Sequence, residues 1–143
     1  MTINSEYLKQ LSPDELDDLY RQSSIGNIPN GKGEGNILSF TQLPKDNPLP
    51  FLIKLLVWQG KVFYRDQGFL LNRMSPFDLK LVKASVYSED SWLAEGNSII
   101  LDYSKTSFVA QAIRDEIREV ATGLYLGQAY WDKTRVLCFS LEF

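Results

Sequence analysis

The last third of the chain, Ile113–Phe143, decides the fold and reads IRDEIREV, ATG, LYLGQAYW, DKT and RVLCFSLEF in turn. Two apolar runs of strand length, Leu124–Trp131 and Arg135–Phe143, are separated by the short polar turn DKT. This pattern indicates a β-hairpin. A dense group of charged residues at positions 114–119 leads into the hairpin.

Strand-like segments also fill the middle of the chain. Lys61–Tyr64 and Phe69–Arg73 flank the turn Arg65–Gly68 and predict a second hairpin. Further strands are expected at Leu79–Tyr87 and Ser98–Tyr103, with turns at 88–90 and 95–97 and a short strand at Ser91–Ala94 between them. The total is roughly seven to nine short strands, which favours a mainly β fold, a lipocalin-like antiparallel barrel with α elements.

The first barrel strand is expected at Gly31–Phe40, which begins with GKGEG. Neither a GK[ST] motif after these glycines nor a strand before them is present, so a nucleotide-binding loop is discounted. Glycine at every second position leaves one face of a strand without side chains. A backbone, an aromatic ring or a ligand can then approach that face closely.

Residues 1–26 predict a helical segment. Ser12, Pro13 and Glu15 fit a capping box with proline in the first helical turn, and Gly26 is the expected stop. The acidic residues near the helix start are explained by the helix dipole, because negative charge is favoured there.

A second helix is predicted at 48–59, where Leu49–Trp58 carries only Lys54 as a charge and Gly60 follows as a stop. A helix so apolar must be covered on most sides. It is a buried core helix, a lid over a cavity or a face for a second subunit. For residues 104–112 the periodicity fits helix and strand alike, and we expect a short helix at about 106–113 followed by a strand from about 115.

The bulk numbers predict a single domain, 1–143, with a helical preface at 1–26 and the barrel at 31–143. The net charge is 15 − 18 = −3 with no basic stripe, which argues against nucleic acid as a partner. A polar N-terminus and the lack of a long apolar stretch predict a cytoplasmic protein without a membrane span. Cys138 is the one cysteine and is expected to be buried and inert.

The sequence contains no histidine, which excludes Ser-His and Cys-His catalysis and nearly all catalytic zinc sites. We expect no metal and no cofactor. Acid–base work would fall to Asp, Glu, Lys, Tyr or Cys138.

Arg114, Glu116 and Arg118 form the first candidate ligand-binding group, since alternate residues share one face of a strand. Two arginines with a glutamate between them would orient a carboxylate-bearing ligand. A solvated strand with cross-strand ion pairs is the alternative explanation. The direction of these side chains depends on the strand register, because a slip of one residue reverses the face.

Aromatic residues extend the candidate site. Tyr125 and Tyr130 follow the charged group, and Trp58 and Lys61 stand at the helix–strand junction. Aromatic rings beside a few polar groups are typical of small-molecule pockets. A desolvated lysine can also act as a base or form a Schiff base. Core packing and an exposed edge lysine are the alternatives.

The chain resembles the small bacterial GXWXG-motif proteins in the order of five short segments: GKGEG, LLVWQGKVF (55–63), IILDY (99–103), REV (118–120) and LG (126–127). It departs from the family's signature, because Gly33 stands where that family has tryptophan. That family implies no reaction and no catalytic residue. More loosely, the glycine-spaced strand and Arg135 before the last strand are similar to the calycins, the lipocalins and fatty-acid-binding proteins. The tryptophan that pairs with this arginine in calycins is missing here.

Two functions from different classes follow. The first is binding of a small, largely apolar ligand (lipid, fatty-acid or isoprenoid-like) in the barrel, with Arg114 or Arg118 at its polar end. The second is an isomerase, cyclase or lyase for a hydrophobic substrate, with Asp115 or Glu116 as base and Tyr125 or Tyr103 as acid. A carboxylate that faces the cavity with a raised pKa would favour the enzyme. A structural protein with a filled barrel, monomeric or homodimeric, is the third option.

Overall fold

The structure is a computed structural model that describes residues 2–42, 54–108 and 110–143. Its centre is a closed antiparallel barrel of eight strands, in which each strand pairs with the next and the last pairs back to the first. The strands are β1 (Gly31–Phe40), β2 (Trp58–Tyr64), β3 (Phe69–Met74), β4 (Leu79–Asp90), β5 (Asn97–Asp102), β6 (Ile113–Ala121), β7 (Leu124–Trp131) and β8 (Thr134–Glu142). The mainly β barrel expected from the sequence is confirmed, with a strand number inside the expected range.

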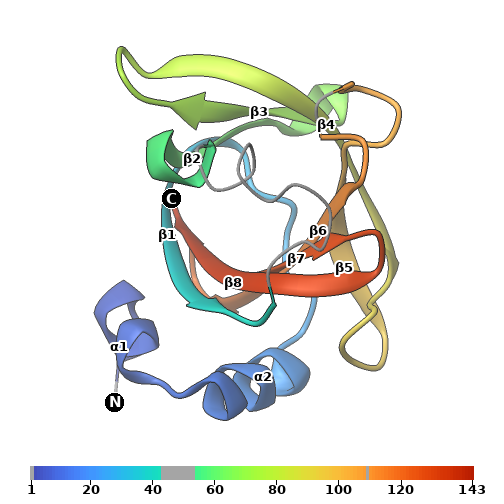
Figure 1. The fold of residues 1–143 in the computed structure, drawn as a ribbon. Coiled ribbons are helices and arrows are strands. Elements are labelled where there is room, and N and C mark those ends of the chain that lie inside the picture. Colours follow the sequence, from blue (N-terminus) through green and yellow to red (C-terminus); the bar gives the residue numbers. More distant parts are fainter. Residues whose placement is uncertain (1, 43–53, 109) are drawn as a thin grey trace.

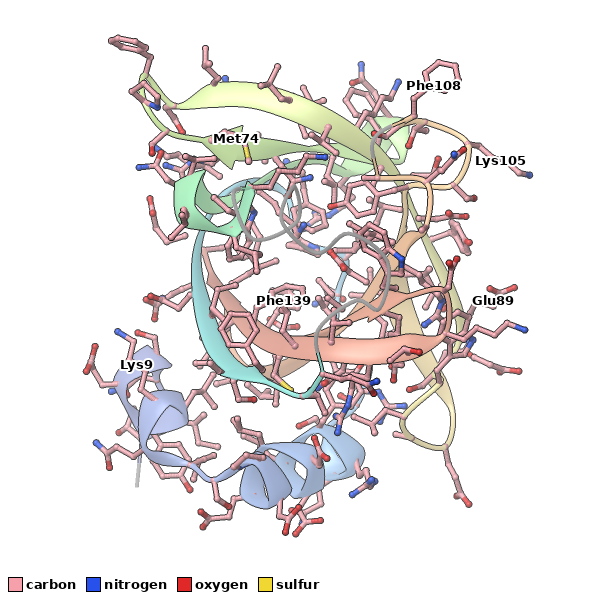
Figure 2. The ribbon with its side chains drawn as sticks, viewed as in Figure 1. Lys9, Met74, Glu89, Lys105, Phe108 and Phe139 are labelled. Carbon is pink, nitrogen blue, oxygen red and sulfur yellow. The ribbon has the colours of Figure 1, made fainter. Side chains whose placement is uncertain are left out.

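Apolar side chains form two cores, one inside the barrel and one outside it. The core inside the barrel contains residues such as Phe63, Leu70, Ile99, Ile117 and Leu141. Figure 2 shows Phe139 pointing into the barrel, whereas Phe108 points away from it. The helices α1 (Ser5–Gln10) and α2 (Pro13–Gln22) lie beneath the barrel in Figure 1. The outer core joins them to β7 and contains Leu8, Leu16, Tyr20, Leu124 and Leu126.

The N-terminal helices begin as local sequence rules require. The Ser12 hydroxyl accepts a hydrogen bond from the Glu15 backbone N–H (3.1 Å), and the Glu15 carboxylate accepts one from the Ser12 N–H (2.9 Å). This reciprocal pair confirms the predicted capping box. The helix ends at Gln22, with Ser23 as its C-cap, so the predicted stop at Gly26 was wrong.

The spaced glycines of β1 make room for aromatic rings, as one of the expectations for that strand required. A Cβ added at Gly33 would lie 2.6 Å from the Phe143 ring, and one at Gly35 would lie 2.3 Å from the Trp58 ring. Both rings therefore pack directly against the β1 backbone.

The predicted helix at 48–59 ends earlier than expected. Residues 54–57 are helical, but Trp58 already begins β2 and Gly60 lies within that strand. The main-chain pairing of Trp58–Tyr64 with β3 takes precedence over the apolar helical pattern. Residues 48–53 of the predicted helix lie outside the described residues.

Two further predictions about the middle of the chain were wrong. The predicted turn at 88–90 belongs to β4, and Ser91–Ala94 forms a bend in place of a strand. The Ser91 hydroxyl accepts hydrogen bonds from the backbone N–H groups of Leu93 and Ala94, both at 3.0 Å. These hydrogen bonds to the serine side chain take backbone N–H groups that strand pairing would otherwise use.

The predicted helix at 106–113 is a series of turns in the part that the structure describes, and β6 begins at Ile113. The Tyr103 carbonyl accepts backbone hydrogen bonds from the N–H groups of Thr106 and Ser107, and the Ser107 hydroxyl accepts one from the Ala110 N–H.

Within the described ranges no helix is both long and apolar enough to cross a membrane.

Candidate functional site

A cavity of about 90 Å³ lies inside the barrel. Its wall is mainly apolar and includes Ile37, Leu55, Trp58, Ile113, Leu137 and Phe139. A single water needs only about 10–15 Å³ measured in this way, so the space exceeds one water several times over. It is smaller than the pockets of about 300–1,000 Å³ that hold drug-sized ligands.

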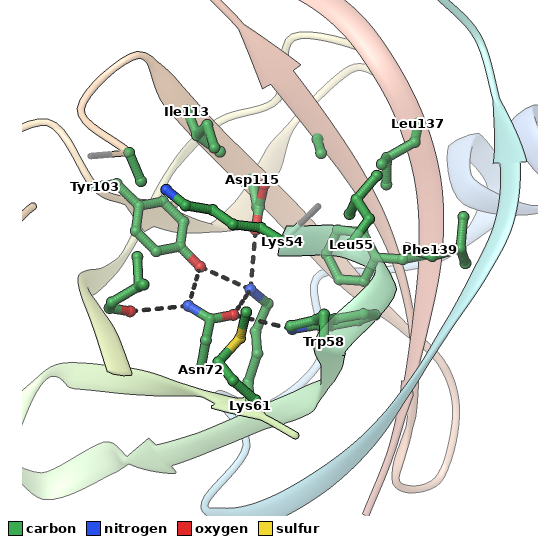
Figure 3. A pocket seen from close by; sticks show the side chains of 15 residues that line it. Lys54, Leu55, Trp58, Lys61, Asn72, Tyr103, Ile113, Asp115, Leu137 and Phe139 are labelled. Carbon is green, nitrogen blue, oxygen red and sulfur yellow. Dashed lines mark hydrogen bonds and ion pairs between the residues drawn. The ribbon is translucent and has the colours of Figure 1, made fainter. Parts of the chain in front are cut away.

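Four polar side chains, Lys61, Asn72, Tyr103 and Asp115, meet at the wall of this cavity (Figure 3). We call them the buried quartet. They come from β2, β3, the residue after β5, and β6, and each of the four residues is at most 6% exposed. Three strands and the residue that follows β5 therefore converge on one polar point inside an apolar barrel.

Lys61 is the centre of the buried quartet. Its Nζ donates to Asn72 Oδ1 at 2.8 Å and to Tyr103 Oη at 2.7 Å, and it lies 3.1 Å from Asp115 Oδ2. The same nitrogen lies 5.5 Å from the centroid of the Trp58 ring and 5.6 Å from that of Phe139. Three oxygen acceptors and two aromatic rings thus compensate a buried ammonium.

Asn72 is held in one orientation. Its Oδ1 accepts from Trp58 Nε1 (3.1 Å) as well as from Lys61. Its Nδ2 donates to the Val82 carbonyl (2.9 Å) and to Tyr103 Oη (2.8 Å). Since an indole N–H and an ammonium can only donate, the amide oxygen must face Trp58 and Lys61.

Burial and charge act against each other within the quartet. Burial acts to lower the pKa of Lys61, but Tyr103 and Asp115 outweigh it and raise this pKa, so the side chain is an ammonium. Burial raises the pKa of the Asp115 carboxyl, although Lys61 opposes the shift. Burial also raises the pKa of Tyr103, which keeps its phenol protonated. A protonated phenol therefore stands beside a buried ion pair.

The local sequence explains why these polar groups face inward. Along β3 the inner face carries Leu70, Asn72 and Met74, and along β6 it carries Ile113, Asp115 and Ile117. An irregularity between Trp58 and Gly60 lets both Trp58 and Lys61 point into the barrel. Asn72 in β3 and Asp115 in β6 each take one inward position between two apolar neighbours.

Arg114, Glu116 and Arg118 lie on the opposite face of β6 and do not line the cavity. Their expected placement at the cavity was therefore wrong. Glu116 is fully buried and accepts hydrogen bonds from Tyr20 Oη (2.8 Å), the Trp92 N–H (2.9 Å) and Arg114 Nη1 (2.6 Å). Burial acts to raise the pKa of Glu116, but hydrogen bonds led by the Ser91 hydroxyl lower it overall.

The two arginines connect this outer cluster to the backbone. Arg118 donates to the carbonyls of Tyr20 (3.2 Å), Ser23 (3.2 Å) and Glu95 (2.6 Å), which ties the end of α2 to the 91–96 bend. Arg114 stacks 3.9 Å from the centroid of the Trp92 ring. The alternative of a solvated strand was also wrong, because α2 and the bend cover this face.

The two tyrosines of the candidate site are separated by the sheet. Tyr125 lies inside the barrel but outside the cavity wall, where it packs against Phe143 with ring centroids 5.5 Å apart. Tyr130 packs on the outer face against Trp92 at 4.9 Å. Of the seven candidate residues, Trp58 and Lys61 line the cavity. Asn72 was missed, although its position between Leu70 and Met74 signals an inward polar group.

Comparison with known proteins reveals the fold and nothing finer. The chain is similar to a protein of Thermomonospora curvata of known crystal structure, with a TM-score of 0.62 and 18% identity over 92% of this chain and 87% of that one. No family model and no curated protein matches the chain. The resemblance to the GXWXG-motif proteins therefore gains no support from these comparisons.

Proposed function

We propose that the protein binds a small, largely apolar molecule in the barrel cavity, with the buried quartet at its polar end. The observation that carries this proposal is the meeting of four buried polar groups at the wall of a cavity whose other lining residues, apart from Lys54, are apolar. Removing one ion from water costs several kcal/mol even after relaxation. A barrel selected only for stability would gain more from apolar residues at these four positions.

The size of the cavity limits the occupant. A space of about 90 Å³ suits a single ring or a short branched chain, or one end of a longer molecule. Leu55 and Trp58 lie in the wall, so the segment that enters β2 is part of the proposed binding site. In this respect the proposal keeps the calycin-like hypothesis, but Lys61 and its partners replace Arg114 and Arg118 at the polar end.

Native mass spectrometry of gently purified protein, followed by organic extraction, tests the proposal. We expect a bound apolar molecule in a one-to-one ratio. Ala129→Leu is the matched variant, because Ala129 lines the cavity opposite Asp115 and a larger side chain there occupies the space without removing any hydrogen-bonding group of the quartet. The variant is expected to lose the bound molecule. Equal retention by both proteins would contradict a site in the barrel.

A second candidate, an isomerase, cyclase or lyase, is favoured by one observation. Asp115 faces the cavity, burial raises its pKa, and the protonated Tyr103 stands beside the same ammonium. A carboxylate base and a phenol acid are the groups that proton transfer requires in a chain without histidine. Chemical change of an extracted molecule on reincubation with fresh protein, and its loss in Asp115→Asn, would favour catalysis over binding alone.

A further inference from the structure

We propose that the cavity selects an uncharged ligand whose polar end is a hydroxyl group and that it discriminates against carboxylates. This inference rests on the binding function proposed above and names its ligand class. It follows from the hydrogen-bond donors and acceptors of the buried quartet that remain for a ligand after the bonds within the quartet are made.

Lys61 has no proton to spare for a ligand. An ammonium donates three hydrogen bonds, and three oxygens stand within reach: Asn72 Oδ1 (2.8 Å), Tyr103 Oη (2.7 Å) and Asp115 Oδ2 (3.1 Å). A ligand carboxylate would have to displace one of these partners. If it displaced Asp115, two carboxylates would share one ammonium in a buried site, which is strongly unfavourable.

Asn72 is also saturated. Its two amide hydrogens go to Val82 and Tyr103, and its oxygen accepts from Trp58 and Lys61. The oxygen of Tyr103 accepts from both Lys61 and Asn72, and its own hydrogen is directed to Asp115, where this hydrogen bond acts to lower the pKa of the carboxyl.

One capacity remains within the quartet: the lone pairs of Asp115 that Lys61 and Tyr103 do not use. A hydroxyl group matches this capacity, because it can donate to the carboxylate and carries no charge of its own. A carboxylate can only accept, and it would bring a second negative charge beside Asp115. A hydrocarbon would leave the carboxylate lone pairs without a donor.

Charge within the quartet agrees with this count, since Lys61 and Asp115 cancel. The arginines of β6 are engaged on the outer face and cannot meet a ligand in the barrel. Lys54 also lies in the cavity wall, outside the quartet, and burial lowers its pKa. A carboxylate held by Lys54 is therefore the competing outcome that the experiment must separate.

The test uses three probes built on one ring: toluene, benzyl alcohol and benzoate. Binding to the ¹⁵N-labelled protein at pH 7 is followed at the indole N–H of Trp58, which lies in the cavity wall and donates to Asn72. We expect benzyl alcohol to bind roughly tenfold more tightly than either toluene or benzoate, the ratio expected for one hydrogen bond to a buried charged group. This comparison needs no variant.

Asp115→Asn should reverse the preference, because the quartet then carries a net positive charge and benzoate becomes the better ligand. Asp66→Asn is the matched control: it removes the same charge from an exposed position and should keep the wild-type order. Lys54→Met should leave the preference for benzyl alcohol unchanged.

The remaining outcomes separate this inference from the binding function. If benzoate binds wild type at least as well as benzyl alcohol, the preference for an uncharged hydroxyl ligand is overturned, while ligand binding in the barrel stands. Loss of benzoate binding in Lys54→Met would then assign the carboxylate to Lys54. Equal affinities for toluene and benzyl alcohol would overturn the hydroxyl preference. Failure of all three probes to bind would overturn the proposed binding function and this inference with it.

Discussion

Replacement of Lys61 by methionine tests whether the buried quartet is held together by one ammonium. The side chain is 3% exposed, and methionine has a similar length, so the change removes charge and hydrogen bonds while it retains packing. Asp115, Tyr103 and Asn72 each lose a donor. Asp115, at 5% exposure, is left as a buried carboxylate without its counter-ion.

The expected cost follows from these contacts. Removal of one partner of a buried ion pair destabilises a protein by about 3–5 kcal/mol, because the remaining charge stays buried without compensation. The double variant Lys61→Met with Asp115→Leu removes both charges and should recover most of this loss. A total stability of about 5–15 kcal/mol leaves room for the single variant to fold.

The cost should also depend on pH. In wild type, burial raises the pKa of Asp115 and Lys61 opposes the shift, so loss of Lys61 raises the pKa further. A group with a raised folded-state pKa contributes stability below its unfolded pKa and loses it as the pH rises through the folded value. The variant should therefore be closer to wild type at about pH 5 than at about pH 8.

Urea unfolding followed by circular dichroism at several pH values measures these effects. A loss of less than about 1 kcal/mol in the single variant at pH 7, with no change between pH 5 and pH 8, would show that the ammonium does not hold the quartet together. A double variant no more stable than the single one would show the same.

Three further predictions concern other parts of the barrel. Gly60→Ala should lower the free energy of unfolding by about 1–3 kcal/mol, because φ at Gly60 is +146° and the new Cβ would lie 2.1 Å from the Gly33 carbonyl oxygen. An unchanged midpoint of urea unfolding would contradict this. Glu116→Gln should destabilise the protein most above about pH 4.5, because the pKa of Glu116 is lowered from its ordinary value of 4.5 and the stability that the carboxylate contributes is lost as the pH falls through the folded-state pKa. Urea midpoints from pH 3 to pH 7 measure this, and a loss of stability that stays constant down to pH 3 would argue against it. Burial raises the pKa of the Cys138 thiol, so Ellman's reagent should label it only after unfolding, and rapid labelling of the folded protein would refute its inertness.

The sequence predicts the barrel well because local signals agree with one another. Short strands with turns between them, the glycine-spaced β1 and the capping box at Ser12 all describe elements that the structure contains. The failures occur where one local preference competes with another. The Ser91 hydroxyl replaces strand pairing in the 91–96 bend, and β2 takes over the end of the apolar segment at Trp58.

The composition of the candidate site depended on which face of β6 points into the barrel. Strand periodicity correctly separates Arg114, Glu116 and Arg118 from Asp115, but it does not say which set faces the barrel. Solvent exposure would usually identify the charged face as the outer one. Here α2 and the 91–96 bend cover that face, and this tertiary contact over about a hundred residues of sequence separation is not visible in the local pattern.

Asp115 could have been placed from its neighbours, because the apolar Ile113 and Ile117 share its face and belong in the core. The partnership of Lys61, Asn72, Tyr103 and Asp115 could not. It depends on the register of β2 with β3 and of β5 with β6, and on the irregularity in β2 that lets both Trp58 and Lys61 point inward.

The most direct test of ligand binding in the barrel is a crystal structure of the protein soaked with benzyl alcohol. We expect a ring between Leu55, Trp58 and Phe139, with its hydroxyl oxygen within hydrogen-bond distance of an oxygen of Asp115. A cavity closed by side chains, or one that holds only ordered water beside an undisturbed quartet at saturating benzyl alcohol, would contradict it.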